Sequence, residues 1–194
     1  MRKVGLAFIC MLLISGCDEY RIIKPENPPI VQAEASPLPL VIGLRNAYQP
    51  AMGSYDLVSS FVRRFIELNL FKAVFYPIRS DDKLDLTMDL TFKYSFEYDK
   101  GGQMKSFITG LFLYLPVLFL EYENHYKLSA TLLISRGAQP IKTYQASTDI
   151  RVVTNLKPPW DKINKESIPA LINDLVDQLV SQVQKDKVVY GGLQ

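Results

Sequence analysis

Strict alternation of apolar and polar side chains over residues 83–98 is the sequence feature that most constrains the fold. The apolar members are Leu84, Leu86, Met88, Leu90, Phe92, Tyr94, Phe96 and Tyr98. Side chains with a period of two lie on the same face of a β-strand, so the segment predicts a strand with one buried face. Its polar members, among them Asp85, Asp89 and Glu97, are then expected to face water, with the sheet covered on one side only.

Periodicity elsewhere in the chain supplies the other elements. Alternation returns at 122–134 and 144–152 around turn residues Gly137 and Pro140, which predicts an antiparallel hairpin. Apolar runs at 38–44 and 73–78 predict two shorter strands, and helical spacing at 54–71 and 168–183 predicts two amphipathic helices. We therefore expect an α+β fold with a mostly antiparallel sheet of four to five strands and both helices packed on one face.

The first seventeen residues have the features of an export signal. Arg2 and Lys3 form a basic start, residues 4–14 carry no charge, and the small residues Ser15 and Gly16 precede Cys17. This combination is typical of a secretory signal, and the apolar run is too short to span a bilayer. An ordinary secretory signal with an incidental cysteine is the alternative interpretation.

The ending Ile14-Ser15-Gly16-Cys17 resembles the lipobox of bacterial lipoproteins. The resemblance implies cleavage before Cys17, which then receives a thioether-linked diacylglycerol and usually an amide-linked acyl chain, so that palmitate is incorporated. In Gram-negative lipoproteins, Asp directly after this cysteine often signals retention at the inner membrane, which Asp18 fits; the outer membrane is the alternative. In either case the resemblance places the protein in the cell envelope, lipid-anchored to the membrane on its periplasmic side.

Composition then divides the chain into segments. Residues 1–16 are predicted to be the signal peptide, and residues 17–37 the acylated cysteine with a tether, because prolines at 25, 28, 29 and 37 disfavour a helix. Residues 38–187 are expected to form a single α/β periplasmic domain. Residues 188–194 are predicted to be a flexible tail.

An uncharged apolar segment at 106–120, bounded by Lys105 and Glu121, interrupts this domain. As one helix it would extend about 22 Å, short of the roughly 30 Å hydrocarbon layer, and Gly110 and Pro116 disfavour a continuous helix. One interpretation makes it a buried connection; the other makes it an exposed tip that enters a membrane or docks on a protein partner. The second interpretation nominates Phe107, Leu111, Phe112, Leu113, Tyr114, Leu115, Leu118 and Phe119 as contact residues.

Charge and rare residues argue against several function classes. Of the 22 basic side chains, Arg2 and Lys3 leave with the signal, and the remaining 20 balance the 20 acidic ones, so we expect no nucleic-acid partner. Cys17 is expected to be acylated and Cys10 lies in the signal, which leaves no disulfide. With His125 as the single histidine and no phosphate-binding glycine loop, we expect no catalytic residue, no metal site and no cofactor. His125 itself is expected at the surface, with a pH-sensing role as the alternative.

The order of lipobox, proline-rich segment, strands and helices is similar to small envelope lipoproteins with a compact α/β domain. Examples are the N-terminal domain of TolB, the CsgG assembly-lipoprotein domain and the LptE type. The resemblance covers element order and no residue motif, so it transfers no functional residue beyond Cys17. It implies a non-catalytic accessory or scaffold subunit of an envelope complex, with an envelope protein as partner. A lipid- or amphiphile-binding lipoprotein is the alternative, and the sequence offers no constellation for a third, a hydrolase.

Overall fold

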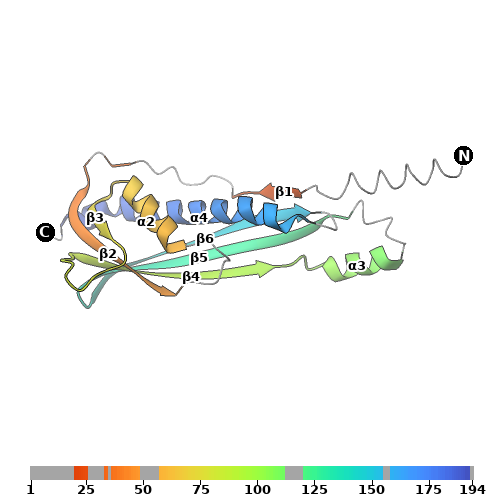
Figure 1. The fold of residues 1–194 in the computed structure, drawn as a ribbon, viewed down its shortest axis with the longest axis horizontal. Helices are drawn as coiled ribbons and strands as arrows, with labels where there is room; N and C mark the ends of the chain where they lie inside the picture. The colour runs from red at the N-terminus through yellow and green to blue at the C-terminus, as the bar shows by residue number, and fades with distance from the viewer. Residues whose placement is uncertain are drawn as a thin grey trace, which may run out of the picture. The chain divides into compact units, whose positions relative to one another are not determined.

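The computed structural model describes residues 20–25, 33–34, 36–48, 57–111, 120–154 and 158–192. Cys17 and the signal lie outside these ranges. The elements, in chain order, are β1 (Tyr20–Ile23), β2 (Leu38–Tyr48), α2 (Leu57–Glu67), β3 (Phe71–Phe75), β4 (Leu86–Glu97), α3 (Gly102–Leu111), β5 (Tyr122–Arg136), β6 (Gln139–Thr154), α4 (Trp160–Lys185) and α5 (Lys187–Gly191), as drawn in Figure 1.

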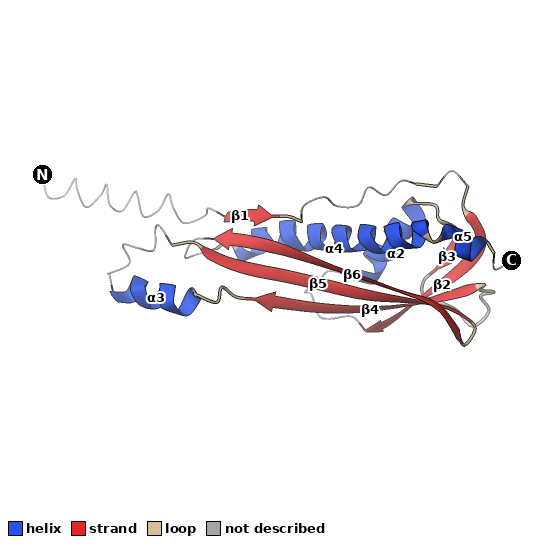
Figure 2. Cartoon of the chain, turned by 180° about the vertical axis from the view of Figure 1, so that it is seen from behind, coloured by secondary structure: helices blue, strands red, loops and turns tan. Residues whose placement is uncertain are grey.

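The strands form a six-stranded mixed sheet in the order β1-β6-β5-β4-β2-β3. Strand β1 pairs antiparallel with β6, whereas β2 pairs parallel with both β3 and β4. Figure 2 shows β5 running opposite to β4 and β6, and the β5–β6 pair is the predicted hairpin. The α+β class is therefore confirmed, whereas the sheet has six strands in place of the four to five expected and includes two parallel pairs. The β2–β3 pair is parallel because α2 is a crossover connection between these strands, and such connections return the chain in the same direction. Residues 76–85 then lead from β3 to β4 on the other side of β2, which makes the β2–β4 pair parallel as well.

The chain divides into two compact units. Unit 1 contains the described residues within 1–24, 96–126 and 149–169, and unit 2 contains those within 25–95, 127–148 and 170–194. Strands β4, β5 and β6 and helix α4 contribute residues to both units, so neither unit is a continuous stretch of sequence.

Unit 2 has a core built from the predicted periodic faces. Figure 1 shows α2 and α4 on the same face of the sheet, and the ion pair between Arg64 Nε and Asp177 Oδ1, at 2.7 Å, joins the two helices. Phe61 of α2 is completely buried and stacks on Phe65 with ring centroids 4.6 Å apart. Full burial of such a side chain stabilises the fold by about 1.5–3 kcal/mol. The core residues that α2, α4 and β4 supply here include Leu57, Val58, Leu171, Leu175, Leu179, Leu86, Met88 and Leu90.

Gly43 of β2 permits a close approach between the strand and the chain segment after β3. A Cβ atom at this position would lie 2.5 Å from Leu84 Cδ1 and 2.8 Å from Ile78 Cδ1, closer than packed carbon atoms come. The peptide bond between Tyr76 and Pro77, which precedes Ile78, is cis. The absence of a side chain at Gly43 therefore lets Ile78 and Leu84 lie directly against β2.

The end of the chain differs from the predicted flexible tail. Residues 187–191 form α5, and Tyr190 is completely buried. The Tyr144 hydroxyl donates to Asp186 Oδ2 at 2.9 Å and lies 2.5 Å from the Tyr190 hydroxyl. Burial, followed by these hydrogen bonds, raises the pKa of Tyr144 far above its ordinary value. The burial of Tyr190 was not predicted because this residue does not belong to a run of regularly spaced apolar residues.

The predicted tether at 17–37 also contains ordered contacts. Strand β1 lies within it, and farther along the Glu34 N–H donates to the Leu68 carbonyl at 2.9 Å. The Lys187 ammonium donates to Glu34 Oε2 at 2.9 Å. These contacts join residues far apart in sequence, so local proline content alone did not reveal them.

Helix α4 begins at Trp160, eight residues before the predicted start at 168, and Pro169 lies inside it. Pro169 is therefore not the first-turn residue that a helix starting at 168 would make it. Ile163 and Ser167 are completely buried on the additional turns. The buried face of the helix thus extends across the proline, and packing offsets the one backbone hydrogen bond that the proline cannot make.

Candidate functional site

Helix α3 of unit 1 begins in a turn that Asp99 organises. The Gly101 N–H donates to Asp99 Oδ1 at 2.7 Å, and the Gly102 N–H donates to the Asp99 carbonyl at 2.9 Å. The Lys105 N–H then donates to the Gly101 carbonyl at 2.9 Å. The first amide groups of a helix have no partner within the helix, and Asp99 supplies acceptors just before α3 begins.

The same carboxylate fixes α3 to the start of β5. Asp99 Oδ2 accepts hydrogen bonds from the Lys105 ammonium at 2.5 Å and from the Glu123 N–H at 3.0 Å. Burial disfavours the charged form of Asp99, but these hydrogen bonds and the one from Gly101 outweigh it, so the pKa of the carboxyl is lowered. Lys105 also donates to the Glu121 carbonyl at 2.6 Å. One partly buried ion pair thus holds the helix in place.

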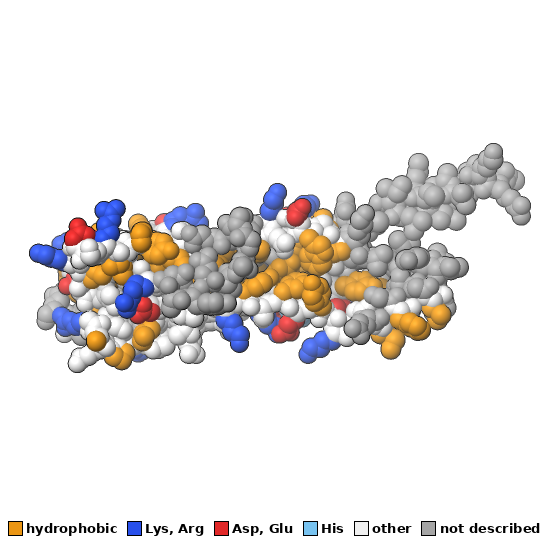
Figure 3. All heavy atoms as spheres, turned by 60° about the horizontal axis from the view of Figure 1, so that its bottom comes forward, with side chains coloured by type: hydrophobic (Ala, Val, Ile, Leu, Met, Phe, Trp, Pro, Cys, Tyr) orange, Lys and Arg blue, Asp and Glu red, His pale blue; other side chains and the backbone are white. Residues whose placement is uncertain are grey.

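The opposite side of α3 is apolar and exposed. Met104, Phe107 and Leu111 are 64%, 66% and 65% exposed, and their spacing of three and four residues places them on one helical face. Figure 3 shows hydrophobic side chains exposed on the surface that includes α3. Lys105 is the only charged residue of the helix, and its ammonium faces Asp99. We call the surface formed by Met104, Phe107 and Leu111 the α3 face.

An aromatic cluster lies in the same unit. The Phe96 ring packs edge-on against Tyr98 and Tyr126, with centroids 4.7 Å apart in each pair, and against Trp160 at 6.0 Å. Trp160 therefore covers the edge of this core. Tyr98 is 73% exposed. Unit 1 thus presents an amphipathic aromatic side chain to solvent in addition to the α3 face.

Strand β1, near the N-terminus, is joined by an ion pair to Glu121, the residue that follows the apolar segment 106–120. Arg21 Nη2 donates to both carboxylate oxygens of Glu121, at 2.8 and 3.0 Å. The Tyr20 hydroxyl donates to Glu166 Oε1 at 2.7 Å. Because the Glu121 carbonyl also accepts from Lys105, β1 and α3 meet at one residue.

The structure describes two of the predicted contact residues. Phe107 and Leu111 lie on the α3 face and are exposed. The others lie outside the described residues, namely Phe112, Leu113, Tyr114, Leu115, Leu118 and Phe119. Met104 and the Asp99–Lys105 pair were not predicted, because they lie outside the apolar segment that begins after Lys105. The Asp-Lys-Gly-Gly turn ahead of apolar residues at 104, 107 and 111 was the signal that could have revealed both.

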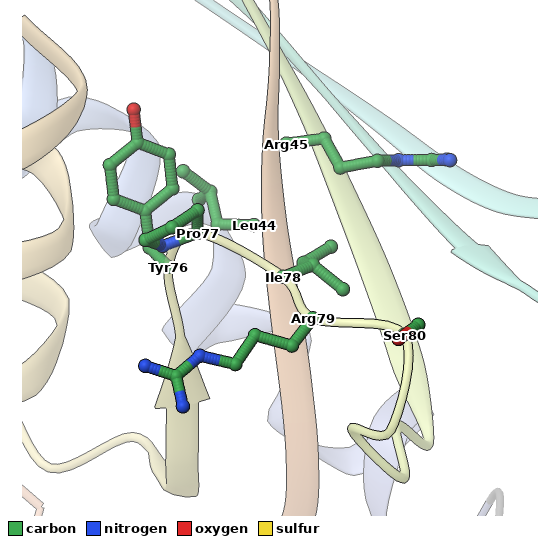
Figure 4. A pocket seen from close by; sticks show the side chains of 7 residues that line it. All are labelled: Leu44, Arg45, Tyr76, Pro77, Ile78, Arg79 and Ser80. Atoms are coloured by element: carbon green, nitrogen blue, oxygen red, sulfur yellow. The ribbon is translucent and has the colours of Figure 1, made fainter.

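A pocket of about 610 Å³ lies in unit 2, beside the segment that follows β3. Its lining consists of Leu44, Arg45, Tyr76, Pro77, Ile78, Arg79 and Ser80, shown in Figure 4. Arg45 Nε pairs with Asp89 Oδ1 at 2.7 Å. Figure 4 shows the guanidinium groups of Arg45 and Arg79 pointing away from each other. The pocket therefore combines an apolar floor with cationic rims that do not converge on one point.

Polar side chains on the uncovered face of the sheet are engaged with one another. His125 Nδ1 lies 2.9 Å from Asp149 Oδ2, and Glu123 pairs with Arg151 at 3.3 Å. Among the described residues, no group of three or more His, Cys, Asp and Glu side chains is placed to hold a metal ion. In the same ranges, no helix combines the length and the apolar character needed to cross a membrane.

Comparison with solved structures gives several matches that cover most of this chain. A neuraminyllactose-binding hemagglutinin homologue from Helicobacter pylori is 12% identical over 87% of this chain and 95% of its own, with a TM-score of 0.49. Rare lipoprotein B from Shewanella oneidensis is 13% identical over 77% and 97%, with a TM-score of 0.43. Lipoprotein B from Nitrosomonas europaea is 12% identical over 84% and 93%, with a TM-score of 0.39.

Two of these matches are bacterial lipoproteins by name. No protein-family model matches the chain, and no curated protein sequence matches it. Because fold does not determine function, the residues themselves must carry any functional assignment.

Proposed function

We propose that this protein is a membrane-anchored lipoprotein on the periplasmic side of the cell envelope, where it acts as a non-catalytic accessory or scaffold subunit of an envelope complex. Acyl chains on Cys17 anchor it, and an envelope protein is its partner. The lipobox resemblance supports the anchor. Asp18 favours the inner membrane as the site of retention.

The observation that carries the membrane location in this proposal is the α3 face. Large apolar side chains gathered on one exposed surface often mark an interaction site, and here three side chains on one helical face are each about two-thirds exposed. The ion pair between Asp99 and Lys105 holds the helix in a defined position, so the exposure does not come from a loosely attached element. Strand β1, which begins three residues after Cys17, belongs to the same unit as α3.

The shifted pKa values support a non-catalytic role. Asp99, Tyr144 and Asp186 all have shifted pKa values. The contacts that shift them tie the turn before α3 and the junction of α4 and α5 to neighbouring strands, so these groups serve structure. A catalytic site would instead direct such groups into a cavity where a substrate could reach them.

Purification of the acylated protein from its own membranes in a mild detergent tests this function. The proposal predicts that a second protein co-purifies in stoichiometric amount and stays bound through size-exclusion chromatography. Recovery of the chain alone, under conditions that preserve other envelope complexes, would contradict an accessory role.

The pocket beside Arg79 favours a second candidate, a binder of lipids or other amphiphiles. Its volume lies within the range of small-ligand sites, and an apolar floor with cationic rims suits an anionic amphiphile. Native mass spectrometry of the purified protein would then detect bound lipid. Arg79→Glu is expected to abolish that binding, whereas the matched reversal Lys72→Glu on β3 is expected to leave it intact; equal retention by both variants would exclude the pocket.

A further inference from the structure

A short series of contacts connects helix α3 to strand β1, which begins three residues after Cys17. From Cys17 to Tyr20 the chain advances three residues, which span at most about 10 Å when fully extended. Arg21, the next residue, pairs with the Glu121 carboxylate, and the Glu121 carbonyl accepts from Lys105 of α3. An acyl group on Cys17 would therefore hold this part of unit 1 against the membrane surface.

From this geometry we propose that the α3 face lies in the same leaflet that receives the acyl chains of Cys17, with the helix parallel to the membrane surface. This inference rests on the proposed acylation and names the lipid bilayer as what the α3 face contacts. A helix of ten residues is about 15 Å long and cannot span the hydrocarbon layer, so it binds at the boundary between headgroups and acyl chains.

The charge pattern of α3 suits a lipid leaflet. The helix contains no acidic residue, and the only cation, Lys105, is already paired with Asp99 on the side away from the α3 face. Insertion of Met104, Phe107 and Leu111 therefore removes no charge from water. Tyr98, exposed in the same unit, has the amphipathic ring that is enriched at membrane–water interfaces.

The consequence is an oriented domain. An anchor followed by a long free tether would let unit 1 take any orientation to the membrane. An anchor three residues before β1, combined with an inserted helix, gives two attachment points on one unit and fixes its orientation. The protein partner then binds surfaces other than the α3 face.

The mature chain offers a direct test, because acylation of Cys17 and loss of Cys10 with the signal leave it without a free thiol. Phe107→Cys or Leu111→Cys in the full acylated protein then provides a single site for an environment-sensitive fluorophore. Both side chains are exposed, so the substitutions leave the core intact. Ser147→Cys, exposed on β6 in unit 2, is the matched control. The proteins are reconstituted into vesicles of phosphatidylethanolamine and phosphatidylglycerol carrying lipids with a quencher near the headgroup or deep in the acyl chains.

The inference predicts that probes at 107 and 111 lose most of their fluorescence, more to the shallow quencher than to the deep one, while the probe at 147 is unaffected. Probes at 107 and 111 that respond like the control, on protein that floats with the vesicles, would overturn the inference and leave the anchor intact. Disulfide-linked pairs of Phe107→Cys chains would overturn it as well, assigning the α3 face to a second copy. Failure of the protein to float would instead show that the proposed anchor is wrong.

Discussion

The ion pair between Asp99 and Lys105 should control the local stability of α3. Replacing Asp99 by Ala removes the acceptor of three hydrogen bonds and leaves the N–H groups of Gly101 and Glu123 without their partner. The Asp99 side chain is only 12% exposed, so water replaces these bonds incompletely. Hydrogen bonds to charged groups contribute about 1.5–3 kcal/mol each, and partial access of water reduces the sum here to about 3 kcal/mol.

Hydrogen exchange followed by mass spectrometry measures this change where it occurs. A chain of two compact units need not unfold in one step, so a global unfolding midpoint would dilute a local effect. A loss of about 3 kcal/mol corresponds to exchange roughly 150-fold faster in a peptide covering 102–111. Asp81→Ala, which removes an exposed turn carboxylate in unit 2, is the control and should leave that peptide unchanged.

A double-mutant cycle with Lys105→Met isolates the ion pair. Because Lys105 is 31% exposed, we expect a coupling of about 1 kcal/mol, between the values of surface and buried pairs. Strictly additive effects of the two substitutions, or acceleration by Asp99→Ala of less than about 10-fold in 102–111, would refute the role assigned to this pair.

Three further predictions concern unit 2. The hydrogen bond from Lys142, followed by that from Tyr144, lowers the pKa of Asp186. The ionised carboxylate therefore stabilises the fold fully above the unfolded pKa of about 3.9, and this stabilisation is lost as the pH falls through the lower folded pKa. Asp186→Asn should therefore weaken the acid dependence of the urea midpoint, and an unchanged pH profile would count against this contact. Gly43→Ala should destabilise by about 1–3 kcal/mol through overpacking, seen as a lower Tm, and a neutral effect would mean that the neighbouring side chains yield easily. Phe61→Ala should cost about 3–5 kcal/mol in urea unfolding because the ring is completely buried, whereas a loss below about 1 kcal/mol would contradict its central position.

Helices and strands whose apolar residues recur with a regular spacing could be predicted from the sequence. Strand β4 and the β5–β6 hairpin follow from alternation, and α2 follows from helical spacing. The parallel pairing of β2 with β4 could not be predicted in this way, because it depends on two connections in series, through α2 to β3 and then through residues 76–85 to β4. Strand β1 is only four residues long, and its pairing exists because β6 offers an edge.

The candidate site could be predicted only in part, because some of its features are local in the sequence and others depend on tertiary contacts. Phe107 and Leu111 stood out because they belong to an uncharged segment, which is a local property. Helix α3 did not, because it depends on Asp99 in the preceding turn, whose carboxylate binds Glu123, 24 residues later in the chain. Tertiary contacts of this kind turn a weak local pattern into a defined helix.

The intact mass of the protein extracted from membranes tests the central claim most directly. The account predicts a chain that begins at residue 17 and carries a thioether-linked diacylglycerol on that cysteine, with or without a further amide-linked acyl chain. A mature chain that keeps residues 1–16, or one whose Cys17 is unmodified, would contradict the anchor on which both the proposed function and the orientation of unit 1 depend.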